Sequence, residues 1–308
     1  MFNRKRMYLI LVFVVFSILI TSCSSTDGSE KIAVDKTDVE VDVSNVDSQE
    51  DEQSKKDAAE QVVVEEQVLL DQDDIKITLK SLEFDGMFGP SLKVLVENNS
   101  EEPITVQTRD SSINDVMTES MFSCDVVSGK KANDSITFME SDLEHAGIKI
   151  IKDIEFKFHI FNSDTWDGVL DSDTITINTS ADLEYVQEYD DSGVIVLDEK
   201  DIKIVMKKVS SEDSFWGADV HVYIENNSDN DITIQARDVS INGFMLEPIF
   251  SSDVIADKKA YDTITFFESD LIDNEITSIE KMELSFHIFE SNGWDTILDT
   301  PMIDVSFE

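Results

Sequence analysis

Two arginines are candidate functional residues because they occupy equivalent places in a repeated pattern. Arg109 and Arg237 are the only arginines after the basic N-terminal segment, and each is followed by an aspartate. A guanidinium group presents a planar fork of donors that suits carboxylates and backbone carbonyls. We interpret both as structural clamps that pair with a carboxylate inside their domains. The alternative is an anion-binding handle, one in each domain.

The three tryptophans are the next candidates. Trp166 and Trp294 each follow a long apolar strand pattern and precede an aspartate. Such a residue usually covers one end of a core, which is our interpretation. The alternative is an exposed stacking platform for a sugar or a peptidoglycan fragment. Trp216 is adjacent to Phe215 in a predicted loop, where the two rings could form an exposed contact site.

Neither catalytic nor metal-binding spacing is evident. Aspartate-rich turns occur at 71–74, 171–173 and 229–231, but none matches the Asp-x-Asp-x-Asp-Gly calcium loop with its distant glutamate. No nucleophile–base spacing is present, and with 66 acidic residues some carboxylate pair always lies close. We predict no metal, no cofactor and no enzyme activity; a cell-envelope hydrolase remains the less favoured alternative. Cys124, which aligns with Ser252, is predicted to be a free, half-buried thiol.

The residues named above recur because much of the chain is written twice. Glu97-Asn-Asn-Ser100 returns as Glu225-Asn-Asn-Ser228, 128 positions later. The same offset relates Arg109 to Arg237 and Trp166 to Trp294. The unit of about 115 residues is large enough to enclose its own core.

Each unit is predicted to consist of short strands. Apolar and polar residues alternate over 75–79, 92–96, 104–106, 136–138, 154–160 and 175–177, which is typical of half-buried strands. His159 and His287 fall on the outward positions of this alternation. A capped helical turn is expected over 141–147, whereas its counterpart at 269–275 lacks the Ser-x-x-Glu start and the glycine stop. Six or seven strands per unit favour an all-β fold with two tandem Ig-like antiparallel sandwiches.

The overall charge limits the partners. The formal net charge is −42, which excludes nucleic-acid binding through a basic patch. The apolar content of 41% is sufficient for a core, and the two cysteines exclude a disulfide-rich scaffold.

The N-terminus has the pattern of an export signal. A basic segment is followed by an apolar stretch from Tyr8 to Leu19, shorter than the roughly 20 residues of a membrane span. Ile20-Thr-Ser-Cys23 then resembles the bacterial lipobox, which implies that Cys23 carries the lipid after cleavage. The alternative is an uncleaved anchor helix. The polar, acidic stretch that follows is predicted to be a disordered tether.

The predicted organisation is a signal peptide at 1–22, Cys23 and the tether over 23–67, a sandwich at 68–180, a linker at 181–192 and a second sandwich at 193–308. It resembles tandem Ig-like domains on lipoproteins of Gram-positive bacteria. We therefore expect a membrane-anchored, extracytoplasmic lipoprotein that presents two binding or structural modules to a cell-envelope protein or glycan. A ligand-sensing or enzyme-accessory module is the main alternative.

Overall fold

The structure is a computed structural model that describes residues 62–210 and 216–307. The predicted signal peptide, Cys23 and most of the predicted tether lie outside the described residues. Within the described part, no helix is long and apolar enough to cross a membrane.

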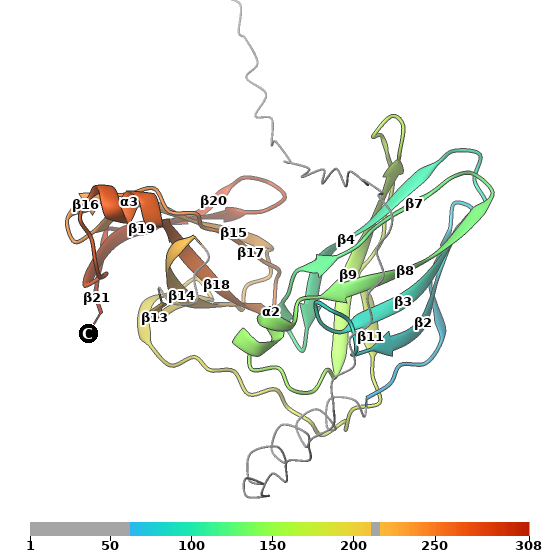
Figure 1. Cartoon of the computed structure of the whole chain (residues 1–308), viewed down its shortest axis with the longest axis horizontal. Coiled ribbons are helices and arrows are strands. Elements are labelled where there is room, and N and C mark those ends of the chain that lie inside the picture. Colours follow the sequence, from blue (N-terminus) through green and yellow to red (C-terminus); the bar gives the residue numbers. More distant parts are fainter. Residues whose placement is uncertain (1–61, 211–215, 308) are drawn as a thin grey trace, which may run out of the picture. The chain divides into compact units, whose positions relative to one another are not determined.

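The first repeat consists of two antiparallel sheets (Figure 1). The first sheet has the order β1 (Gln67–Gln72), β2 (Ile75–Glu83), β3 (Ser91–Asn98), β8 (Lys130–Phe138), β6 (Ser120–Met121). In the second sheet, β9 (Asp153–Asn162) pairs with β4 (Ile104–Ile113) on one side and with β10 (Gly168–Asp171) and β11 (Ile175–Asn178) on the other. Two short strands, β5 (Val116–Met117) and β7 (Ser123–Val126), pair with the other edge of β4.

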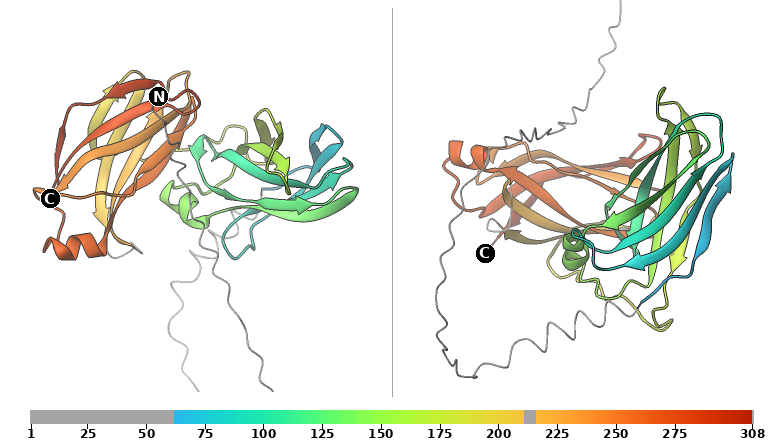
Figure 2. Two further views of the ribbon diagram at one scale, coloured as in Figure 1. Left: turned by 90° about the horizontal axis from the view of Figure 1, so that it is seen from above. Right: turned by 45° about the vertical axis from the view of Figure 1, so that its right-hand side comes forward.

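The second repeat has the same arrangement, drawn from yellow to red in Figure 2. Its first sheet has the order β12 (Val194–Glu199), β13 (Ile202–Ser210), β14 (Gly217–Asn226), β18 (Lys258–Phe267). Its second sheet contains β15 (Ile232–Ile241), β16 (Phe244–Met245), β17 (Ser251–Val254), β19 (Lys281–Glu290), β20 (Thr296–Asp299) and β21 (Ile303–Ser306). Each repeat is an Ig-like antiparallel β-sandwich, as the sequence predicted.

The core of each sandwich is built by strict alternation along the strands. In β9, Ile154, Phe156, Phe158 and Ile160 point inward and are fully buried, while the residues between them are only partly covered. Burying one such side chain contributes about 1.5–3 kcal/mol. The counterparts in β19 are Met282, Leu284, Phe286 and Ile288, all equally buried.

The folded part extends further toward the N-terminus than the sequence predicted. Val62 is buried in the core of the first repeat. The backbone amide of Val63 donates to Ser180 Oγ at 2.9 Å, and the amide of Ser180 donates to the carbonyl of Val63 at 2.8 Å. The predicted tether boundary at 67 is therefore wrong, because the side chain of Val62 packs into the core and the backbone of Val63 pairs with Ser180.

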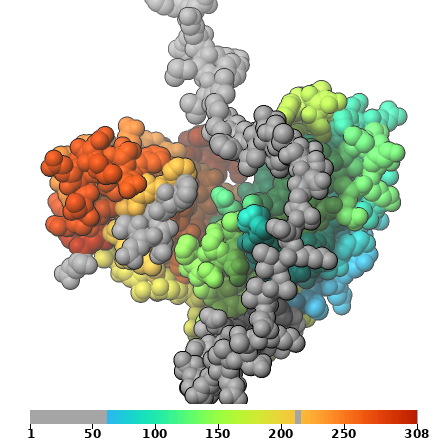
Figure 3. Space-filling model, in the orientation of Figure 1, coloured from blue at the N-terminus to red at the C-terminus, as the bar shows by residue number. Residues whose placement is uncertain are grey.

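Both repeats contain a short helix, which the sequence predicted for only one of them. Helix α2 (Glu140–His145) begins one residue before Ser141, and its N-cap residue is Met139, whose side chain makes no capping hydrogen bond. The predicted capping box therefore does not form. Helix α3 (Glu268–Asp273) forms without those signals and has no buried residue, which agrees with its place at the surface in orange in Figure 3.

The repeated Glu-Asn-Asn-Ser motif is structural. The side chain of Asn98 is completely buried, and its amide donates to the carbonyls of Glu102 (2.8 Å) and Val126 (2.9 Å). Its Oδ1 accepts from the backbone amide and the hydroxyl of Ser100. Asn226 makes the same four hydrogen bonds with Asn230, Val254 and Ser228.

Replacing Asn98 with alanine should lower the free energy of unfolding of the first repeat by about 2–4 kcal/mol, because the buried carbonyl of Val126 would lose its donor. Urea denaturation of the full chain measures this loss. Asn99→Ala, at the exposed neighbouring position, is the control and should change stability by less than about 0.5 kcal/mol. Equal effects of the two variants would contradict the structural role of the motif.

Candidate functional site

The most unusual backbone on the second sheet is at the two tryptophans that follow β9 and β19. Trp166 and Trp294 have φ angles of 65° and 62°, in the left-handed region that favours glycine. A bulky residue there costs about 1–2 kcal/mol. Each side chain is nevertheless 75% exposed, so no core packing offsets the cost. The prediction that these residues cover the core is therefore wrong, and the exposed alternative is what the structure has.

Each tryptophan lies on a buried phenylalanine. The rings of Trp166 and Phe161 are stacked with centroids 5.3 Å apart and an interplanar angle of 16°, and those of Trp294 and Phe289 are 5.4 Å apart at 13°. This spacing is within the range of favourable aromatic stacking. One side of each indole is therefore supported from below.

A histidine continues the row of rings along the strand. The ring centroids of His159 and Phe161 are 5.5 Å apart. The Nδ1 atom of His159 is 2.5 Å from Oδ1 of Asp171 on β10. An ionised carboxylate only accepts, so Nδ1 carries the proton and the pair fixes the orientation of the imidazole. In the second repeat, His287 lies 5.1 Å from Phe289 and 2.6 Å from Asp299.

The neighbouring strand adds polar side chains to the same surface. Gln107 of β4 is directly opposite His159, and Arg109 is opposite Lys157. Residues opposite each other in an antiparallel pair, and residues two apart on a strand, share one face of the sheet. We name this surface the aromatic face. It comprises Gln107, His159, Phe161, Trp166 and Asp171 in the first repeat, and Gln235, His287, Phe289, Trp294 and Asp299 in the second.

The turn that carries the tryptophan is fixed by a buried threonine. Thr105 Oγ1 is 2.6 Å from Oδ1 of Asp125 and 2.9 Å from Ser163 Oγ at the start of the turn. The backbone amide of Trp166 donates to the carbonyl of Asn162 at 2.9 Å. The second repeat has the same contacts through Thr233, Asp253, Ser291 and Glu290. The position of each tryptophan is therefore set by hydrogen bonds to the sheet rather than by a free loop.

The two arginines are not internal clamps. Both side chains are exposed, and within residues 62–210 and 216–307 neither forms an ion pair with a carboxylate. The Arg-Asp dipeptides instead form β-bulges, in which Asp110 and Asp238 take φ angles of 53° and 52°. Aspartate tolerates this conformation better than most residues. The arginines lie at the edge of the aromatic face, opposite Lys157 in the first repeat and Ser285 in the second.

The other singled-out residues lie elsewhere. Trp216 is 56% exposed and meets Phe267 edge to face at 6.1 Å, while Phe215 lies outside the described residues. Cys124 is free, as predicted, but fully rather than half buried, and burial raises the pKa of its thiol to about 12. The described part of the chain contains no group of three or more His, Cys, Asp or Glu residues that could hold a metal ion.

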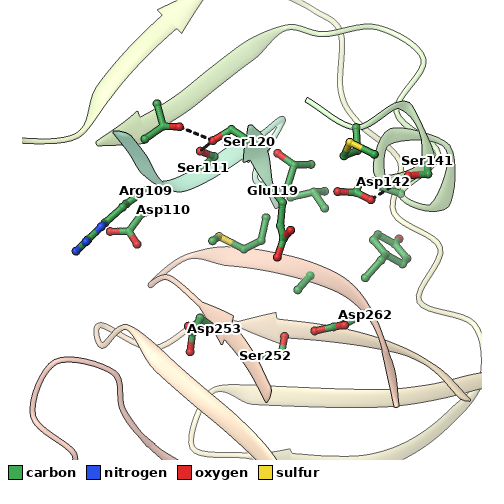
Figure 4. A pocket seen from close by; sticks show the side chains of 18 of the residues that line it. Arg109, Asp110, Ser111, Glu119, Ser120, Ser141, Asp142, Ser252, Asp253 and Asp262 are labelled. Atoms are coloured by element: carbon green, nitrogen blue, oxygen red, sulfur yellow. Dashed lines mark hydrogen bonds between the residues drawn. The ribbon is translucent and has the colours of Figure 1, made fainter. Parts of the chain in front are cut away.

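The described part of the chain also contains an acidic recess (Figure 4). It has a volume of about 650 Å³ and is lined by hydroxyl and carboxyl groups, with Arg109 at its margin. Burial raises the pKa of Asp142 and of Asp262. Such a lining accepts hydrogen-bond donors and cations and repels anions. Its acidic residues are Asp110, Glu119, Asp142, Asp253 and Asp262.

Sequence reasoning missed much of the aromatic face. The outward position of His159 was predicted, but its partner Asp171 and the supporting Phe161 were not. The signal was available, because Phe161 follows His159 by two residues and therefore shares its outward face. An apolar ring on the outer face of a strand needs a cover, and Trp166 supplies it.

No protein-family model matches the chain, and no curated protein does. Among solved structures, one match is the complex of the Salmonella enterica SafA pilin with the SafB chaperone. It has 11% identity and a TM-score of 0.19, and the match covers 70% of this chain and 89% of that one. Another is the CsuC–CsuE chaperone–tip adhesion subunit complex of Acinetobacter baumannii, with 12% identity, a TM-score of 0.19 and coverage of 70% and 90%. Likeness at this level says nothing about what the chain binds.

Replacing Trp166 with glycine should change the free energy of unfolding by less than about 1 kcal/mol. Relief of the left-handed backbone offsets the lost stacking on Phe161. Phe158→Ala, which empties a core position on the same strand, should cost about 3–5 kcal/mol. Thermal melts of the two variants measure the difference. A loss at Trp166→Gly as large as that at Phe158→Ala would show that the indole is part of the core.

Proposed function

We propose that the chain is a lipid-anchored protein of the extracytoplasmic face of a bacterial membrane, and that its two sandwiches are binding modules. The contact surface of each module is its aromatic face. The lipobox-like segment ending at Cys23 supports the anchor, and the two acyl chains expected there are sufficient for stable attachment. Binding rather than catalysis accounts for a surface that combines a flat ring with fixed polar groups.

One observation carries the binding role. Both repeats place a tryptophan in a strained backbone conformation, support it with a phenylalanine and leave its other side to solvent. Backbone strain at a side chain that is mostly exposed to solvent is typical of functional sites. Exposed tryptophan is also among the residues that contribute most to binding energy.

The anchor is tested by metabolic labelling with a fatty-acid analogue. The wild-type chain should be labelled, and Cys23→Ser should lose the label completely, because a serine cannot form the thioether. Cys124→Ser is the matched control and should be labelled like the wild type. Label retained by Cys23→Ser would refute lipid attachment at this residue.

The contact surface is tested by sedimentation of the full chain, kept in detergent, with membrane-free cell-wall fragments. The double variant Trp166→Ala/Trp294→Ala should bind at least about tenfold more weakly than the wild type, because each indole removed costs about 1 kcal/mol or more. Trp216→Ala removes an exposed tryptophan outside the aromatic face and should bind normally. Unchanged sedimentation of the double variant would exclude the aromatic faces as the contact surface.

A further inference from the structure

The rings of the two aromatic faces have the same arrangement, which constrains the ligand. The ring spacings differ by at most 0.4 Å between repeats, since His159–Phe161 is 5.5 Å and His287–Phe289 is 5.1 Å. The tryptophan stacks agree to 0.1 Å, at 5.3 and 5.4 Å. Two equivalent sites in one chain suit a ligand that presents the same group more than once.

The polar groups around the indole carry both signs of charge. Asp167 follows Trp166 directly, and the carboxylate of Asp171 contacts His159 of the aromatic face. Arg109 and Lys157 lie on the same face of the sheet, two positions from Gln107 and His159, and Lys157 pairs with Asp110. In the second repeat the arginine is Arg237, and Ser285 stands opposite it. A strongly anionic ligand would meet the carboxylates and the net charge of −42, while a cation would meet the arginine and the lysine. A neutral ligand with both hydroxyl donors and acceptors fits this arrangement.

The apolar part of the face is small. The described hairpin of β9 and β10 has one large exposed apolar side chain besides Trp166. This is Val169, which is 42% exposed. A stable protein interface buries about 800 Å² on each partner around an apolar centre. A single indole provides much less than this, whereas it matches the flat C–H surface of one sugar ring.

From these three observations we infer that each aromatic face binds one unit of a neutral glycan, and that the two repeats together bind a polymer of that unit. The sugar ring lies on the free side of the indole. Its hydroxyl groups donate to the aspartate carboxylates and accept from Gln107 and the arginine. This inference rests on the proposed function and specifies its ligand.

Two equal sites joined in one chain predict a difference between short and long ligands. A single sugar unit occupies the faces independently, so removing one tryptophan should reduce the number of sites from two to one and leave the dissociation constant unchanged. A polymer engages both faces, and its second contact forms at high effective concentration. Removing either tryptophan should therefore weaken polymer binding by at least about tenfold.

The test uses the full chain in detergent on an array of neutral and acidic glycans, followed by calorimetry with the monomer and the polymer of the glycan that binds. The variants are Trp166→Ala, Trp294→Ala, the double variant and the Trp216→Ala control. The expected result is binding to a neutral glycan that the double variant lacks and the control retains, with the single variants losing one site for the monomer and at least tenfold affinity for the polymer.

Several results would overturn the inference. If wall fragments bind in a tryptophan-dependent way but no neutral glycan does, the ligand class is wrong and the proposed function stands. Tryptophan-dependent binding of an acidic glycan, or competition by polylysine, would likewise replace the neutral ligand with a charged one. If a single variant changed the affinity for the monomer and for the polymer equally, the two repeats would not bind one polymer together. If wall fragments also fail to bind, the proposed function fails as well.

Discussion

The central strand of the second sheet, β9 in the first repeat and β19 in the second, contributes side chains to the core on one face and to the aromatic face on the other. The rest of each repeat depends on this constraint. Because side chains alternate along a strand, Phe158 and Ile160 can fill the core only if His159 and Phe161 point outward. A slip of one residue would exchange the two sets and lose the core, so the register is strongly specified. The register that places the inward side chains therefore also places the outward rings of His159 and Phe161. Trp166, which stacks on Phe161, is positioned by the same strand.

The turn after this strand keeps its hydrogen bonds independently of the tryptophan side chain. A glycine at Trp166 would satisfy the backbone at lower cost, and Gly168 shows that glycine occurs in the same hairpin. The Thr105–Asp125–Ser163 hydrogen bonds hold the turn without help from the indole. What the tryptophan adds is a flat apolar surface that faces water. The second repeat has kept the residue, its backbone conformation and its stacking partner together, although many other positions in the two copies differ.

The sequence predicted the fold well where alternation is strict and poorly where tertiary contacts decide. The strands over 75–79, 92–96 and 154–160 were found because half of each faces the core. Strand β1 was missed because both of its ends are exposed, and helix α3 was missed because no cap marks it. The exposure of Trp166 could not be read from sequence, since a ring at a strand end can turn either way and its φ angle decides which. The prediction that the arginines are internal clamps was wrong for a related reason. The Arg-Asp pair forms a β-bulge in which Asp110 takes the left-handed conformation, and Arg109 beside it has no buried partner.

The charge of the chain bears on how such a surface could work. Several ion pairs of the described residues join exposed lysines to exposed carboxylates, such as Lys80 to Glu66 and Lys281 to Asp304, and pairs of this kind add little stability. An excess of carboxylates this large opposes compaction by self-repulsion. The cost is tolerated here because two separate apolar cores, each with many fully buried aliphatic and aromatic side chains, stabilise the repeats. The negative charge also repels anionic lipids and polymers. Weak contacts at an uncharged ring therefore do not compete with stronger electrostatic binding of such anions. If each aromatic face binds a neutral ligand as proposed, such a background favours its selectivity, and two linked faces would reach an affinity that neither has alone.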